Sequence, residues 1–371
     1  MKRFMAVLAA LVLLCSTAAV AESTFAPIPK EQLKVGVVYI GDITDGGYTY
    51  AHHQGILAMQ QAVGLSDDQI ILKKNVNDGA HSDTEAAIRE LIENGCQVIF
   101  ATSYGYMETM QMMAEEFPEI IFLHCSGDKF DFTAPNFDYY FGRIYESRYL
   151  AGIAAGLKTE TNHLGYVSAF GVIPECVYSL NAYYLGAKSV NPDVKMTVKV
   201  LNSWYDPTLE RQAADALLDQ GCDVIAQHCD TTGPVVAAND RGKWAVGYNA
   251  DMSAAGPGAY LTAPVWNWGA YYATAVQSIV DGTWKPTAEE GGVLMGMADG
   301  LVELAPLTDI CAEGTAEQVE AASQSIVSGE FGIFVGPISD NQGNVVVPEG
   351  TTLTPAEIRN VLWFADGITV E

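Results

Sequence analysis

The chain repeats itself once, and this internal repeat limits the folds that are open to it. Residues 87–101 align with residues 213–227 at an offset of 126, so that the pattern Gly-Cys-x-Val-Ile recurs in register. Residues 36–41 align with 165–170 at an offset of 129. The order of elements is therefore the same in both halves, and we expect two related lobes.

Each half alternates short apolar runs with amphipathic stretches. Residues 35–40 form an apolar run that ends at Gly41, residues 56–63 have helical spacing, and residues 70–72 are again extended in character. Residues 84–94 then indicate an amphipathic helix. Repeated βα units form a parallel sheet with helices on both faces. We predict an α/β fold with two similar Rossmann-like lobes, each with a parallel sheet, joined by a hinge.

Length and charge support this prediction and exclude some functions. A single core stops growing at roughly 250–300 residues, and the chain has 371. It carries 45 Asp and Glu against 19 Lys and Arg, for a formal charge of −26. A phosphate backbone must be met by clustered basic residues, so a nucleic-acid partner is excluded. The excess of acidic residues also favours a neutral ligand over a nucleotide.

The N-terminus has the features of a secretory signal peptide. A basic start at residues 2–3 precedes the apolar run 4–15, and the small residues 19–21 form an A-x-A cleavage pattern. A membrane anchor is the alternative, but the run is shorter than the ~20 residues that span a bilayer. A lipoprotein would use Cys15, and the bulky Leu14 argues against it. We expect cleavage near Ala21 and a protein in the periplasm or outside the cell.

Six cysteines remain after cleavage. An even number permits disulfides, with fifteen possible pairings, and buried free thiols are the alternative. Cys96 and Cys222 each lie where a helix gives way to an apolar strand, which indicates packing. The sequence leaves open whether these cysteines form disulfides or stay as free thiols.

The loops after the strands are the expected ligand-binding region, because ligands of such sheets bind at the carboxyl ends of the strands. These loops are rich in aromatic rings, hydroxyls and Asp, a lining that suits a small, flat, polar ligand. They cover residues 42–50, 102–107, 170–175, 228–234 and 249–251, and their candidates include Ser103, Tyr104, Asp230 and Asp251.

Two further segments contribute aromatic candidates. In the sequence Asp45-Gly-Gly-Tyr-Thr-Tyr, the glycines permit close backbone approach, Asp45 can accept hydrogen bonds from a ligand N–H, and the ring of Tyr48 can stack. Trp266 and Trp268 point the same way if their segment is extended. The alternatives are a helix-capping loop for the first segment and lobe packing for the second.

Signals for catalysis or metal binding are weak. The chain has no Gly-x-Ser-x-Gly elbow, no His-Glu-x-x-His, no phosphate-binding loop and no EF-hand loop. His52 and His53 are adjacent and would diverge on a helix. We therefore predict no catalytic residue, no cofactor and no metal. A secreted hydrolase or nucleosidase stays open as an alternative.

An ordered set of motifs resembles the basic membrane protein (BMP) family of substrate-binding proteins. The match runs from about residue 33 to the C-terminus, and its motifs include residues 34–39, 45–52, 101–107, 149–156, 202–207, 223–228, 268–272 and 281–285. The resemblance implies a periplasmic binding protein of type I, a receptor for an ABC importer that is similar to purine nucleoside receptors.

The resemblance also assigns roles to individual residues. The family's stacking aromatics fall on Tyr48 and Phe170, and its ribose-contacting Asp falls on Asp251. Two positions depart from the nucleoside receptors, which carry Asn at Thr49 and Lys at Trp266. Because that Lys helps to hold the ribose, we favour a free purine base, with nucleosides as the next possibility. A receptor for another solute such as a sugar is the further alternative.

The expected organisation is a signal peptide followed by two lobes. We assign residues 22–142 and about 262–285 to lobe 1, and residues 143–261 with part of 286–371 to lobe 2. The chain would cross between them near Gly142, near Thr262 and after Asp281. The expected partners are a small-molecule ligand and an ABC permease, and we expect a monomer that captures its ligand by lobe closure.

Overall fold

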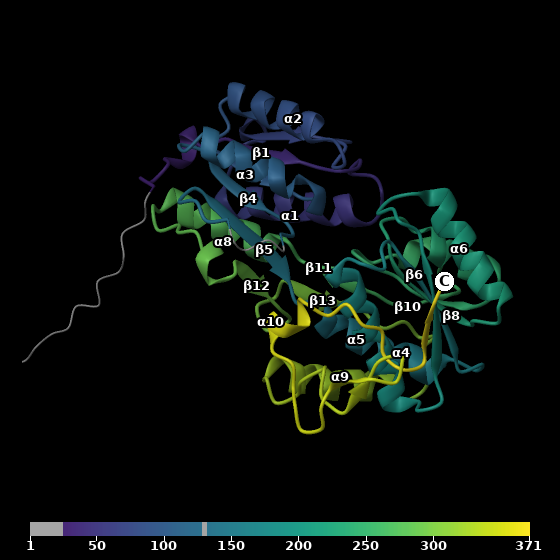
Figure 1. Cartoon of the computed structure of the whole chain (residues 1–371). Helices are drawn as coiled ribbons and strands as arrows, with labels where there is room; N and C mark the ends of the chain where they lie inside the picture. The colour runs from purple at the N-terminus through teal and green to yellow at the C-terminus, as the bar shows by residue number, and fades with distance from the viewer. Residues whose placement is uncertain (1–24, 128–131) are drawn as a thin grey trace, which may run out of the picture.

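The computed structural model describes residues 25–127 and 132–371, and these form two lobes (Figure 1). Each lobe is built on a six-stranded sheet whose described strand pairs run parallel. The predicted α/β fold with two parallel sheets is confirmed. The predicted signal peptide, residues 1–21, lies outside the described residues.

The first sheet has the order β12-β5-β4-β3-β1-β2. Alternate side chains along its strands face opposite helix pairs, so that α1 and α8 cover one face and α2 and α3 the other. The strands are β1 (Val35–Val38), β2 (Ile70–Lys73), β3 (Val98–Ala101), β4 (Ile121–His124), β5 (Phe137–Gly142) and β12 (Val293–Met295). The helices are α1 (Tyr48–Val63), α2 (His81–Glu93), α3 (Met107–Glu116) and α8 (Gly269–Val280).

The second sheet has the order β10-β9-β8-β6-β7-β16. Helices α4 and α5 pack on one face, α6 and α7 pack on the other, and α9 packs beside α4. The strands are β6 (His163–Ser168), β7 (Lys195–Val200), β8 (Val224–His228), β9 (Trp244–Val246), β10 (Tyr260–Thr262) and β16 (Ile368–Val370). The helices are α4 (Tyr145–Lys158), α5 (Pro174–Val190), α6 (Pro207–Asp219), α7 (Gly233–Asp240) and α9 (Thr315–Val327).

Short elements complete the described chain. Two antiparallel pairs and one short helix lie outside the main sheets: β11 (Pro264–Trp266) with β13 (Val302–Leu304), β14 (Ile338–Ser339) with β15 (Val345–Val347), and α10 (Pro355–Ile358). Single turns of 3₁₀ helix occur at η1 (Lys30–Gln32), η2 (Asp67–Gln69), η3 (Tyr104–Tyr106), η4 (Ser253–Ala255) and η5 (Ala288–Glu290).

The polypeptide passes between the two sheets through three segments. The first joins β5 to α4, the second runs from β10 through β11 to α8, and the third runs from β12 through β13 to α9. Strands β11 and β13 pair with each other, so two of the three segments form one antiparallel ribbon. Sheet membership places β12 with the first sheet and β16 with the second.

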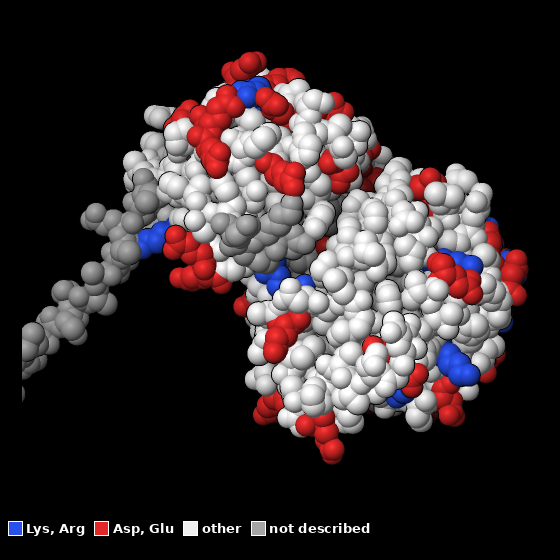
Figure 2. All heavy atoms as spheres, viewed as in Figure 1, with Lys and Arg blue, Asp and Glu red and all other residues white. Residues whose placement is uncertain are grey.

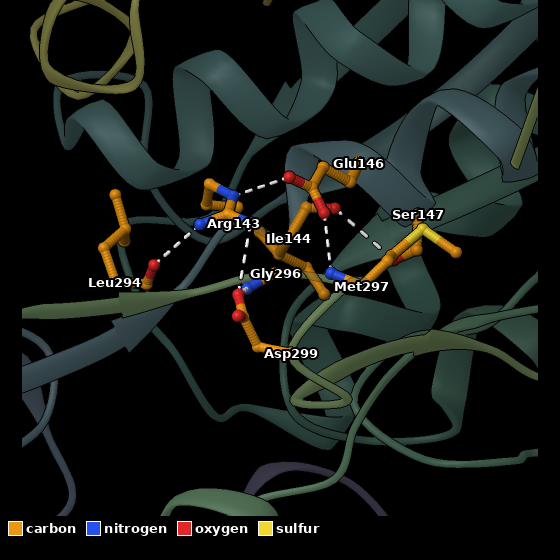
Figure 3. A network of polar contacts seen from close by, with 8 residues as sticks. All are labelled: Arg143, Ile144, Glu146, Ser147, Leu294, Gly296, Met297 and Asp299. Atoms are coloured by element: carbon orange, nitrogen blue, oxygen red, sulfur yellow. Dashed lines mark hydrogen bonds and ion pairs between the residues drawn. The ribbon is translucent and has the colours of Figure 1, made fainter. Parts of the chain in front are cut away.

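A polar network ties the first segment to the third (Figure 3). The Arg143 guanidinium donates Nε to Glu146 Oε1 (2.6 Å) and Nη1 to the Leu294 carbonyl (2.7 Å). Glu146 Oε2 accepts the backbone N–H of Met297 (2.7 Å). Arg143 Nη2 also lies 3.2 Å from Asp299. These partly buried charge-assisted hydrogen bonds hold the two segments as one unit beside the hinge ribbon.

The described residues bear on the predictions about the cysteines, a membrane anchor and the surface charge. All six described cysteines are free, so the thiol alternative applies to this structure. No helix among the described residues is long and apolar enough to cross a membrane. Acidic side chains spread over both lobes on the face drawn in Figure 2, where basic side chains are few.

Candidate functional site

A narrow pocket lies between the two lobes. Each lining residue lies at or just beyond the carboxyl end of a strand, or in the first turn of the helix that follows, as expected for this kind of sheet. Lobe 1 contributes Ile40, Tyr48, Ser103, Tyr104 and Ser126, and lobe 2 contributes Glu175, Trp204, His228, Asp230 and Tyr248.

The wall from lobe 1 consists of rings and hydroxyls. The ring of Tyr48 packs edge-on against His52 (centroids 4.4 Å apart), and its Oη lies 3.6 Å from the Cys125 thiol. Ser103 donates its hydroxyl to Asp78 Oδ2 (2.6 Å). Tyr104 follows Ser103 and lines the pocket from the 3₁₀ turn η3. The contacts with His52 and Cys125 hold the ring of Tyr48 in place.

The wall from lobe 2 carries the ionisable groups. His228 Nε2 lies 3.3 Å from Glu175 Oε1. Burial lowers the pKa of His228, so the ring is neutral near pH 7. A neutral ring that donates Nε2–H to Glu175 keeps a lone pair on Nδ1. Nδ1 is buried and has no hydrogen-bond partner among the described residues. Nδ1 is thus a buried acceptor that no described residue uses.

Asp230 is buried in the same wall. Burial raises the pKa of its carboxyl well above the usual value, and the nearby carboxylates of Asp45, Glu210 and Glu175 raise it further. Asn249 donates Nδ2 to Asp230 Oδ1 (3.4 Å), which opposes the shift. A ligand N–H or hydroxyl that donates a hydrogen bond to this buried carboxyl would stabilise its charged form.

Tyr248 lies beside His228, with ring centroids 4.6 Å apart. The fully buried guanidinium of Arg148 lies 3.7 Å from the centre of the Tyr248 ring, a cation–π contact. Arg148 also donates Nη1 to the Gln227 carbonyl (2.8 Å). Tyr248 Oη is buried without a hydrogen-bond partner among the described residues. The wall thus holds a second buried polar atom that no described residue uses.

The two lobes touch at the edge of the pocket. A Cβ atom on Gly47 would lie 1.9 Å from the Asp230 carbonyl oxygen. Gly46, with φ of +69°, approaches Thr232 of lobe 2. On another side, Ser126 donates its hydroxyl to Glu175 Oε2 (3.5 Å). The glycines expected to allow close approach therefore let one lobe's backbone meet the other, and the structure is closed over the pocket.

The structure places Asp45 and Thr49 at the start of α1 rather than in the main pocket. Asp45 accepts the backbone N–H groups of Gly47, Thr49 and Tyr50 at 2.9–3.0 Å, so its carboxylate caps the helix. Burial raises the pKa of this carboxyl, and the three N–H groups oppose the shift. Asp45 and Thr49 line a neighbouring cavity that shares Ile40 and Asp230 with the main pocket.

Four other candidates lie outside the main pocket. Phe170 packs edge-on against Trp204, with centroids 4.8 Å apart, and Trp204 is the ring that lines the pocket. Asp251 is exposed and accepts the Ser253 N–H (2.8 Å).

Trp266 and Trp268 belong to a packed aromatic column. Their rings stack 4.5 Å apart, and Trp268 stacks on His52 at 4.3 Å. Trp266 donates Nε1 to Asn249 Oδ1 (3.0 Å). The two indoles pack into the hinge region, which is the alternative that the sequence left open.

Sequence reasoning missed several lining residues. Glu175 ends a loop that was noted only as a segment, and Trp204 belongs to one of the motifs quoted for the resemblance. His228 ends a strand beside Asp230, and Tyr248 follows the next strand of the sheet. Their signal was position: each comes at or soon after the carboxyl end of a strand, where ligands bind.

Residues 32–335 match the profile of the Bmp family, described as ABC transporter substrate-binding protein PnrA-like. The chain belongs to this family. The predicted membership is therefore confirmed, and so is the prediction that the chain is not an enzyme, because Bmp proteins bind solutes for ABC transporters. Their partners are a small-molecule ligand and a permease, and they act outside the cytoplasm.

Two curated relatives are each 38% identical to this Bmp protein. One is a purine-binding protein of Brucella abortus (strain 2308), matched over 339 residues that cover 91% of this chain and 93% of the relative. The other is a protein of Haloferax volcanii named as an ABC transporter glucose-binding protein, matched over 319 residues that cover 86% of this chain and 78% of the relative.

Solved structures show the same fold. A solute-binding protein of an ABC transporter from Aeropyrum pernix superposes with a TM-score of 0.68 at 18% identity, covering 83% of this chain and 93% of its own. A second one, from Conexibacter woesei, has a TM-score of 0.65 at 21% identity, covering 81% and 97%. Both support the periplasmic binding protein architecture.

Proposed function

We propose that this chain is the extracytoplasmic receptor of an ABC importer and captures a purine base or nucleoside by closure of its two lobes, with the free base favoured. The observation that carries the proposal is the composition of the closed pocket. Its lining joins aromatic rings with carboxyl groups and an imidazole, and the described lining contains no Lys or Arg. Rings stack on a flat heterocycle, and the polar groups match its N–H and ring-nitrogen edge.

Four of the predicted ligand contacts line this pocket, and we propose that they hold the ligand together with five residues from the structure. The first group is Tyr48, Ser103, Tyr104 and Asp230, and the second is Ser126, Glu175, Trp204, His228 and Tyr248. The 38% identity to a purine-binding protein supports the ligand class.

The positions that the resemblance links to ribose support the free base. Trp266 stands where nucleoside receptors carry Lys, and its indole is committed to Asn249 and Trp268. Asp251 is exposed and caps a turn at Ser253. Neither side chain lines the pocket, so both ribose contacts of the nucleoside receptors would be missing.

We propose the rest of the organisation as follows. Residues 1–21 are removed on export to the periplasm or the exterior, and the mature protein is a monomer. Lobe 1 comprises residues 22–142 and about 262–285, to which β12 adds a strand of the first sheet, and lobe 2 comprises 143–261 and part of 286–371. The mass of the secreted polypeptide tests whether residues 1–21 are removed. The mass of the particle in solution tests whether the protein is a monomer.

A sugar receptor is the second candidate, because a 38% identical relative is named as glucose-binding. Calorimetry separates the two. The protein is unfolded in guanidinium, freed of bound small molecules, refolded, and titrated with adenine, hypoxanthine, xanthine, adenosine and glucose. We expect micromolar or tighter binding of at least one base, weaker binding of adenosine, and no heat with glucose.

Matched variants test the site. Tyr48→Ala should weaken base binding about tenfold, since it removes a stacking ring, and Tyr50→Ala should leave it unchanged, since Tyr50 is exposed beside it. Binding of glucose without any purine would overturn the proposal. Tighter binding of adenosine than of adenine would overturn the preference for a base, and hydrolysis of inosine would indicate a nucleosidase.

A further inference from the structure

The C-terminal segment beyond the family match carries an arginine that joins the two lobes. The match to the family profile ends at residue 335, short of the C-terminus to which we expected it to run, and Arg359 follows α10 in the segment 336–371. We propose that Arg359 is a latch: a positioning residue that stabilises the closed state and slows ligand release from outside the main pocket. The part of this proposal that concerns ligand release rests on the proposed function.

The segment is anchored on lobe 2. Strand β16 pairs in parallel with β7 at the edge of the second sheet. The buried side-chain amide of Asn181, in α5, makes two hydrogen bonds to the segment. Its Nδ2 donates to the Trp363 carbonyl (2.7 Å), and its Oδ1 accepts the Ala365 N–H (2.9 Å). Any movement of lobe 2 therefore carries these residues with it.

The capped turn of α10 fixes the position of the Arg359 backbone. Thr354 and Glu357 form a capping box at α10, in which the Glu357 N–H donates to Thr354 Oγ1 (3.3 Å) and the Thr354 N–H donates to Glu357 Oε2 (2.7 Å). The helix is one turn long, and Ile358 at its end is buried. Arg359 comes next, partly buried, with its direction set by this anchored turn.

The guanidinium reaches lobe 1. Nη2 donates to the Gly127 carbonyl (2.8 Å), just after β4, and Nη1 donates to the Gly291 carbonyl (3.2 Å), just before β12. Both strands belong to the first sheet. A charged donor anchored on one lobe is thus hydrogen-bonded to two backbone acceptors of the other, and rotation of the lobes changes both distances.

This contact lies beside the pocket. Arg359 lines a small cavity together with Tyr104, Ser126 and Glu175, which also line the main pocket. Because Arg359 is absent from the main lining, it acts on the ligand through closure. The Arg143 network differs, since it ties two crossover segments to each other at the hinge (Figure 3). One arginine orders the hinge, and the other bridges the lobes.

The test compares Arg359→Ala with Arg359→Lys and with Arg211→Ala. Arg211 is the matched control, because its ion pairs with Asp215 and Asp240 stay within lobe 2. Adenine dissociation is measured by stopped-flow fluorescence, and the radius of gyration by small-angle X-ray scattering, with and without adenine. Thermal midpoints report any loss of folding.

We expect Arg359→Ala to release adenine faster, on the order of tenfold, with association changed less than about threefold, as for loss of hydrogen bonds to a charged donor. The ligand-free variant should be more open than the wild type, Arg359→Lys should lie between them, and Arg211→Ala should match the wild type. Unchanged release and scattering in Arg359→Ala would overturn the latch.

The two proposals fail in different ways. If the wild type binds no purine, the proposed function fails, and scattering of the ligand-free proteins still decides the latch. If Arg359→Ala does not fold, Arg359→Lys decides it by the same two measurements, because lysine keeps the charge and loses the bidentate geometry.

Discussion

The two lobes share most of their sheet topology and differ at the last strand. The order β4-β3-β1-β2 in lobe 1 is repeated as β9-β8-β6-β7 in lobe 2, with β5 and β10 in equivalent places. The sixth strand joins opposite edges: β12 lies beside β5, whereas β16 lies beside β7. The repeated part forms the scaffold, and the part outside the repeat supplies the third hinge segment and the latch.

The repeated cysteines show why the scaffold is the same in both lobes. In lobe 1, a Cβ on Gly36 would lie within 3.2 Å of Leu91 and Cys96 side-chain atoms. In lobe 2, a Cβ on Gly165 would meet Leu217 and Cys222 in the same way. A strand glycine thus makes room for the following helix and its Cys, so these thiols are packing residues.

The pocket walls differ although the scaffolds match. Lobe 1 offers Tyr and Ser side chains, and lobe 2 adds Glu175, His228 and Asp230. Under the proposed function, a flat ligand between the walls would meet rings from both lobes, while its polar edge would meet lobe 2. The repeat therefore does not extend to the loops, which carry the binding chemistry.

The largest effect is expected where the lobes touch. Gly47→Ala places a Cβ 1.9 Å from the Asp230 carbonyl oxygen, so the closed state must distort. We expect adenine affinity to fall by about tenfold or more, in line with overpacking costs of roughly 1–3 kcal/mol. Calorimetry measures the affinity, and scattering shows whether adenine still closes the lobes. Gly79→Ala is the control, because its Cβ meets Asn77 at 3.4 Å. Unchanged affinity in Gly47→Ala would show that the lobes close differently.

The next effect distinguishes two aromatic rings of lobe 2. Trp204→Ala removes a lining ring, and we expect about tenfold weaker adenine binding. Phe170→Ala removes the ring that packs behind Trp204, and we expect adenine binding to weaken about threefold or less. Tryptophan fluorescence and calorimetry measure both. A larger loss in Phe170→Ala would restore the stacking role that the family resemblance assigned to Phe170.

The smallest effect is on stability and concerns buried acids. Burial raises the pKa of Asp138, in β5, from 3.8 to about 6. Between these values the folded protein holds a proton that the unfolded chain has released, so the contribution of Asp138 to stability falls as the pH rises from about 4 to about 6. Asp138→Asn should remove this decline.

The thermal midpoint of Asp138→Asn relative to the wild type should rise by a few degrees across that window and stay constant above it. Asn keeps one acceptor oxygen, Oδ1, which can still accept the Tyr139 N–H and the Thr287 hydroxyl. Adenine affinity should not change, because Asp138 lies in the scaffold, unlike Asp230. A difference that does not vary with pH would contradict the raised pKa.

The sequence predicted the binding loops better than the side chains within them. Tyr48, Ser103, Tyr104 and Asp230 were chosen because their loops follow strands, and they line the pocket. Asp45 was chosen for the same reason, yet its carboxylate caps α1 with three N–H groups. Position along the chain identifies a loop, but only the local backbone determines where a side chain points.

The sequence by itself determined the fold and the place of the site. Strand and helix periodicities are local, and a repeat at an offset of 126 residues preserves them, so two parallel sheets with ligands at their strand ends follow directly. The tertiary structure decided which groups meet. Tyr48 and His228 are 180 residues apart, and Arg359 reaches Gly127 across 232 positions. Such contacts depend on how two lobes dock, and no local pattern encodes that geometry.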